Sequence, residues 1–163
     1  MPYWQLFYHL VWSTKYREPL ITPEFEPIVY DLVQTKAIGL GATVFAIGGM
    51  PDHVHIVAAI PPKIAVAKFV GQIKAVAATK FNKMNTGGVL YWQNEYGVFS
   101  FDGKRLPNVI AYVQRQKEHH AKQGTIPVLE RQSGDNKWLL REPGPVYAVD
   151  DATWRAELDA LDD

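Results

Sequence analysis

Residues 42–60 read ATVFAIGGMPDHVHIVAAI, and this stretch decides the fold. Two short runs rich in β-branched residues, 42–47 and 53–60, flank a segment at 48–52 that contains two glycines, a proline and an aspartate. This pattern is typical of two antiparallel strands joined by a turn. We therefore predict a β-hairpin with a loop over 48–52.

Further elements are predicted on both sides of the hairpin from the spacing of apolar residues and from capping and turn residues. They are a strand at 4–13, a helix from Thr22 to Gly39 or Gly41, a helix over 66–81, strand-like runs at 89–92 and 97–101, and a helix over 107–122. The resulting order is β-α-β-β-α-β-α. It predicts the α+β class, a ferredoxin-like or RNA-recognition-motif-like sandwich with one four-stranded antiparallel sheet and helices on one face.

The chain has 163 residues, no cysteine, no apolar run long enough to cross a bilayer and no signal-peptide pattern at its start. These features predict a cytoplasmic protein without a membrane association, and they exclude disulfides and thiolate chemistry. The composition suits one main domain, which we place at 1–124. Residues 125–163 are interpreted as an acidic carboxy-terminal extension with a short helix over 152–161.

The formal net charge of zero hides an uneven distribution of charge. Residues 1–124 carry 13 basic and 8 acidic residues, whereas 125–163 carry 4 and 9. The stretch from His53 to Asn94 contains no acidic residue. A basic surface without acids attracts nucleic acid, although a solvated helix face would have the same composition. The candidate phosphate contacts are Lys15, Arg17, Lys68, Lys74 and Lys80.

His53 and His55 lie two apart on a predicted strand, so both imidazoles point to one face of the sheet. Two neutral imidazoles on one face are a common start of a divalent metal site. The alternative is a pair of partly exposed polar residues beside a loop. On the third predicted helix, Tyr112 and Gln116 are four apart and share a face. If that face meets the histidines, Gln116 is a third ligand and Tyr112 a nucleophile; otherwise Tyr112 is a core residue.

Four blocks of the sequence together resemble a known family. HLVWSTKYR at 9–17, GMPDHVHI at 49–56, WQNEYGVFS at 92–100, and Tyr112 with Gln116 are similar to the single-tyrosine HUH transposases. These are the small TnpA-like transposases of insertion sequences and the REP-associated tyrosine transposases. The resemblance covers about three quarters of the chain, in the order found in the family.

The resemblance implies that 1–124 is an HUH transposase-like catalytic domain. It implies that His53, His55 and Gln116 bind Mg²⁺ or Mn²⁺ and that Tyr112 attacks single-stranded DNA, giving a covalent 5′-phosphotyrosine and a free 3′-hydroxyl. It further implies a homodimer that recognises DNA hairpin ends and uses no nucleotide cofactor. His9 is expected to be structural.

Two other functions are compatible with the residues alone. The main alternative is a single-stranded nucleic-acid-binding module without catalysis, in which His53 and His55 are surface residues. The other is a metal-dependent phosphoesterase that transfers to water. Only the transposase leaves DNA covalently attached to the protein.

Overall fold

The computed structural model describes residues 2–133, and every structural statement below concerns those residues. The chain divides into two compact units after Ser133, and the described residues belong to the first unit. The helix expected over 152–161 lies outside the described residues. None of the described helices is long and apolar enough to cross a membrane.

The core of the fold is one antiparallel sheet of four strands, β1 (Phe7–Ser13), β2 (Thr43–Met50), β3 (His53–Ala59) and β4 (Gly97–Phe101). The strands lie in the order β2-β3-β1-β4, so the central strands are β3 of the hairpin and β1 from the start of the chain. This arrangement confirms the predicted α+β class with a four-stranded antiparallel sheet.

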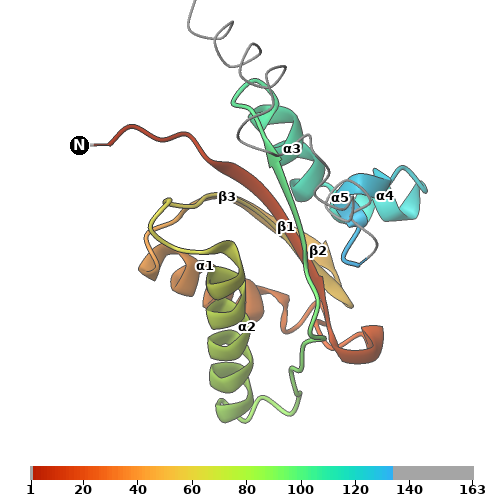
Figure 1. The fold of residues 1–163 in the computed structure, drawn as a ribbon. Helices are drawn as coiled ribbons and strands as arrows, with labels where there is room; N and C mark the ends of the chain where they lie inside the picture. Colours follow the sequence, from red (N-terminus) through yellow and green to blue (C-terminus); the bar gives the residue numbers. More distant parts are fainter. Residues whose placement is uncertain (1, 134–163) are drawn as a thin grey trace, which may run out of the picture. The chain divides into compact units, whose positions relative to one another are not determined.

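Helices cover both faces of this sheet (Figure 1). On one face, α1 (Glu26–Gly39) and α2 (Val66–Lys83) bury Trp12 and Ile56 in the larger of two apolar clusters. On the other face, α3 (Leu106–Gln114) packs Val109 and Val113 against the strands. The prediction that the helices share one face is therefore wrong for the third helix. The reason is that this second face also carries apolar residues that need cover.

The third predicted helix is divided into two. The helical backbone is interrupted at Arg115, whose φ of −106° and ψ of 26° are not helical. After it come α4 (Gln116–Ala121) and, further along, α5 (Pro127–Glu130). No glycine or proline marks this break, so the sequence pattern indicated one continuous helix.

Two strand predictions also change. The first strand begins at Phe7 rather than at residue 4. Residues 89–92 form no strand, and Trp92 makes a single bridge to Thr14. Thr14 is followed by a short turn, η1 (Lys15–Arg17), in which Tyr16 and Arg17 have left-handed φ values of 56° and 53°.

The hairpin turn is shorter than predicted, because β2 continues through Gly48, Gly49 and Met50. Only Pro51 and Asp52 connect the two strands. Gly48 is needed because α3 comes close to the sheet here: a Cβ at this position would overlap the main-chain carbonyl of Val113. Glycine at this position therefore lets α3 lie directly on the sheet.

We expect Gly48→Ala to lower the free energy of unfolding by about 1–3 kcal/mol, since the added methyl pushes α3 away from the sheet. Urea titration followed by circular dichroism measures the change. Gly71→Ala is the control, because Gly71 lies in α2 with open space at its Cβ position and should gain about 0.5–1 kcal/mol. Equal stability of the two variants would contradict the close approach.

Candidate active site

The two histidines of β3 point to the same face, as the strand period predicts, and both are completely buried. The alternative in which they are partly exposed surface residues does not fit this burial. α3, α4 and α5 lie over them and bring four further polar side chains to the same place. These are Tyr112, Gln116, His120 and Glu130.

His53 is oriented by a carboxylate. Its Nδ1 lies 2.7 Å from Oδ1 of Asp52, and a carboxylate can only accept, so Nδ1–H donates; when the ring is neutral, as a metal ligand must be, Nε2 then carries the lone pair. Nε2 is buried and makes no hydrogen bond. Burial alone would lower the pKa of His53, but Asp52 and Glu130 raise it to about 8. A carboxylate behind the far nitrogen is the usual arrangement of a metal-ligating histidine.

Asp52 is itself held in place by Arg17, whose Nε donates to Oδ2 over 3.2 Å. The hydrogen bond to His53, followed by the charge of Arg17, lowers the pKa of Asp52 despite its partial burial. Asp52 is therefore ionised and is a constant acceptor for His53. Arg17, predicted as a phosphate contact, thus lies in this chain of contacts behind the histidine.

His55 is fixed from both sides. Its Nδ1 lies 2.7 Å from Nε2 of His9, and its Nε2 lies 3.1 Å from Oε2 of Glu130. Burial, followed by the neighbouring His55, lowers the pKa of His9 to about 3. Burial also lowers the pKa of His55. His9 is therefore neutral and positions His55, in agreement with its expected structural role.

Glu130 of α5 is the centre of the cluster. Its Oε1 accepts from Tyr112 Oη at 2.6 Å and lies 3.5 Å from Nε2 of His120, while its Oε2 faces both strand histidines. Burial on its own would raise the pKa of Glu130, but its contacts with the histidines and Tyr112 hold it well below its usual range. The carboxylate is thus ionised beside three imidazoles.

The Tyr112 hydroxyl lies within the same cluster. It donates to Glu130 and accepts from the main-chain N–H of Ile126 at 2.9 Å. The ring stacks on His119, with 4.7 Å between ring centroids. Burial, together with Glu130, raises the pKa of Tyr112 to about 12. The phenol is therefore protonated, and an attack by its oxygen must move this proton.

Gln116 and His120 complete the cluster from α4. Gln116 is buried, and its Oε1 lies 3.2 Å from Nε2 of His120. Ligand atoms of His53, His120 and Glu130 all lie within 4.8 Å of one another. Two imidazoles and one carboxylate suit a divalent ion such as Mn²⁺ better than Mg²⁺, which prefers oxygen ligands alone. The unpartnered Nε2 of His53 fits this use, so the residues present can hold a metal.

The predicted basic residues lie in different places. Lys15 and Lys74 line a groove beside α2 that is described further below. Lys68 and Lys80 are exposed on α2, which packs on the sheet face opposite to the histidines.

Three residues of the cluster were not assigned from the sequence as site residues: Asp52, His120 and Glu130. Asp52 lies directly before the histidine pair, so its contact with His53 could have been anticipated. Glu130 lies in the segment interpreted as an extension, where the sequence pattern gave no sign of a site. In the structure the neighbouring Leu129 is buried, which shows that this segment packs on the domain.

The chain is similar in sequence to known transposases. The model of the IS200-like transposase family matches residues 2–116, a range that includes both strand histidines, Tyr112 and Gln116. The chain is 26% identical over 121 residues to the ISDra2 transposase TnpA of Deinococcus radiodurans, covering 71% of this chain and 86% of the relative. It is 25% identical over 124 residues to the IS200 transposase of Salmonella typhimurium, covering 71% and 79%.

Two solved structures share the fold. A Deinococcus radiodurans protein assigned as a transposase has a TM-score of 0.56 at 24% identity, covering 71% of this chain and 95% of that one. A REP-associated tyrosine transposase bound to a REP hairpin has a TM-score of 0.53 at 13% identity, with 77% and 76% covered. The chain belongs to the IS200-like transposase family.

Proposed function

We propose that this protein nicks and rejoins single-stranded DNA, with Tyr112 as the nucleophile. The observation that carries the proposal is the position of the Tyr112 hydroxyl, which contacts Glu130 among the buried histidines of β3. A phenol needs a neighbouring acceptor and an electrophilic phosphate in order to react. Glu130 is such an acceptor. A metal ion held by His53, His120 and Glu130 would make the phosphate more electrophilic.

In the proposed reaction, Tyr112 Oη forms a bond to the scissile phosphorus and the bond from phosphorus to the 3′-oxygen breaks. The phenol proton leaves along its hydrogen bond to Glu130 and passes to water, and the 3′-oxygen takes up a proton from water. The products are a 5′-phosphotyrosine and a free 3′-hydroxyl. Attack of a 3′-hydroxyl on the phosphotyrosine reverses the step and joins strands, so no nucleotide cofactor is required.

His53, together with His120 and Glu130, would hold Mn²⁺ or Mg²⁺ at this site. The family resemblance implies His55 and Gln116 as partners of His53 instead. When bound, the ion supplies a positive charge that polarises the phosphate and stabilises the developing charge. Gln116 contacts His120, so its amide lies next to the group formed by His53, His120 and Glu130. This contact supports a contribution of both ligand sets to one metal site.

The proposed substrate is single-stranded DNA next to a hairpin, and one of the structural neighbours is bound to a REP hairpin. The cations Lys15, Arg17, Lys68, Lys74 and Lys80 are proposed to contact its phosphates. The chemistry uses domain 1–124 and, from the extension 125–163, Glu130. We place its action in the cytoplasm.

The family resemblance further implies a homodimer, and we retain it in the proposal. Within one chain, however, Tyr112 already lies beside the histidines of the same chain, with 6.2 Å between the ring centroids of Tyr112 and His55. This contact supports a site assembled within each subunit. Mixing Tyr112→Phe with His53→Ala protein should then restore no activity, whereas restoration would indicate a site shared between subunits.

The proposal is tested with a labelled pool of DNA hairpins that carry randomised single-stranded flanks. With Mn²⁺ present, part of the label should become covalently attached to the protein, and a chelator should prevent this. Duplexes of the same sequences should give no adduct. Binding without any adduct would favour the non-catalytic module, and cleavage without an adduct would favour transfer to water.

A further inference from the structure

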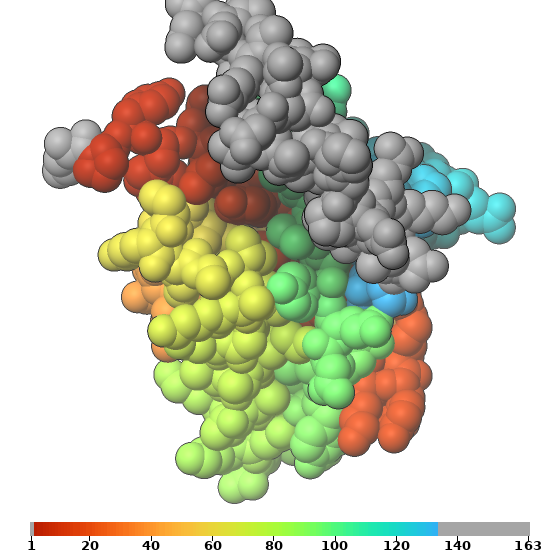
Figure 2. All heavy atoms as spheres, in the orientation of Figure 1, coloured from red at the N-terminus to blue at the C-terminus, as the bar shows by residue number. Residues whose placement is uncertain are grey.

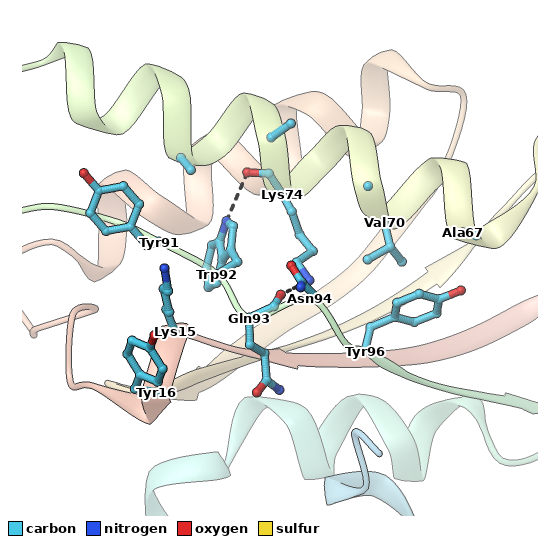
Figure 3. Close-up of a pocket in the computed structure, with 13 residues that line it drawn as sticks. Lys15, Tyr16, Ala67, Val70, Lys74, Tyr91, Trp92, Gln93, Asn94 and Tyr96 are labelled. Atoms are coloured by element: carbon cyan, nitrogen blue, oxygen red, sulfur yellow. Dashed lines mark hydrogen bonds between the residues drawn. The ribbon is translucent and has the colours of Figure 1, made fainter. Parts of the chain in front are cut away.

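A groove of about 810 Å³ lies on the other side of the molecule from the histidine cluster, along α2. One wall is formed mainly by small residues of α2, and the other by residues 91–94 and Tyr96 together with Lys15 and Tyr16 of η1 (Figure 3). Figure 2 shows α2 and the chain that follows it side by side on this face. None of the residues that line the groove is acidic.

Aromatic rings are unusually exposed here. Tyr16 is 81% and Tyr91 53% exposed, and Trp92 and Tyr96 are partly exposed in the same groove. The left-handed backbone at Tyr16 is unfavourable in free energy for a residue with a Cβ, and such strained residues cluster at functional sites. Exposed rings beside a wall of small residues leave room for a flat group between them.

Two lysines give the groove a positive charge. Lys15 lies with its Nζ 5.4 Å from the centre of the Tyr16 ring, and its side chain runs between Tyr16 and Tyr91 in Figure 3. Lys74 donates to the main-chain carbonyls of Gln93 and Glu95, which fixes the second wall. An ammonium group has three donors, and these carbonyls take two of them.

The groove is joined to the active site at the end of β1. Trp92 bridges to Thr14, and Gln93 donates to Gln132 over 2.7 Å, two residues beyond Glu130. On the same turn, Lys15 lies in the groove while Arg17 contacts Asp52, the residue that orients His53. The segment that forms one wall of the groove therefore contacts residues next to Glu130 and to the histidine cluster.

From this arrangement we propose that the groove binds an unpaired nucleotide of the DNA strand. The base stacks on Tyr91 and Tyr16, and Lys15 contacts a neighbouring phosphate. Aromatic faces stack on any base, and an ammonium group attracts the phosphate backbone. The proposal rests on the proposed function, because it concerns an unpaired part of the same single-stranded substrate.

The test measures binding of fluorescein-labelled oligo(dT) by anisotropy at several salt concentrations. Tyr91→Ala and Tyr16→Ala should each weaken binding roughly tenfold, whereas Tyr91→Phe, which keeps the ring, should bind as the wild type does. Tyr3→Ala is the control, since Tyr3 is 89% exposed and lies outside the groove. These residues are exposed, so circular dichroism should show unchanged folding.

A phosphate contact is separated from stacking by the salt dependence. Lys15→Ala should reduce the slope of log affinity against log salt by about 0.7, the value for one contact on a single strand. Lys83→Ala, on α2 outside the groove, and the tyrosine variants should keep the wild-type slope.

Wild-type affinity in both tyrosine-to-alanine variants, or an unchanged slope in Lys15→Ala, would overturn the groove proposal. If the wild type nevertheless forms the covalent adduct, the proposed function stands and only the groove is wrong. A wild-type protein that binds no single-stranded DNA at all would overturn both proposals.

Discussion

Tyr112→Phe is expected to abolish covalent attachment of DNA, with a loss on the order of 10⁴-fold or more in cleavage rate. The change removes a single oxygen and keeps the ring that stacks on His119. Without that oxygen no bond to phosphorus can form at this position. Labelled single-stranded DNA and denaturing electrophoresis measure the adduct directly.

The same variant should remain folded and should still bind DNA. It loses the hydrogen bonds of the hydroxyl to Glu130 and Ile126, so its free energy of unfolding should fall by about 1–2 kcal/mol. Tyr3→Phe is a matched control, because it removes a phenol oxygen from an exposed ring that lies outside the groove and the histidine cluster, and it should retain adduct formation. An adduct formed by Tyr112→Phe would remove Tyr112 from the nucleophile's role.

His53→Ala is expected to weaken Mn²⁺ binding more than about 100-fold and to prevent cleavage. A change behind a ligand typically costs 10- to 100-fold in affinity, and here a candidate ligand atom itself is lost. Isothermal titration with Mn²⁺ measures the effect independently of DNA. Comparing Glu130→Gln with Gln116→Ala in the same titration shows which of the two residues contributes more to the site.

His119→Ala is the control for this measurement, because His119 stacks on Tyr112 but does not belong to the group that can hold the ion. Its Mn²⁺ affinity should stay within about twofold of the wild type. If His53→Ala bound Mn²⁺ as tightly as His119→Ala does, the metal would have to lie elsewhere or be unnecessary.

Local patterns predicted the parts of this molecule that depend on neighbouring residues in the chain. The strand period placed His53 and His55 on one face, and the order of elements predicted the four-stranded antiparallel sheet. The helix period placed Tyr112 and Gln116 together, and both are found beside the histidines despite the break at Arg115.

What the sequence did not predict depends on contacts between distant segments. Gly48 and Gly49 have the pattern of a loop, but they lie in β2 because α3 approaches the sheet there. Glu130 lies in an acidic segment with little periodicity, and its place among three imidazoles follows only from the packing of α5 on the sheet. The charge composition of that segment did not indicate that Glu130 contacts the active site.

The central claim is that Tyr112 carries the DNA during the reaction. The most direct measurement isolates the adduct formed with the labelled hairpin pool, digests the protein and identifies the modified peptide by mass spectrometry. The account predicts one nucleotide remnant, linked through its 5′-phosphate to Tyr112. A remnant on another residue, a link through a 3′-phosphate, or cleaved DNA with unmodified protein would contradict it.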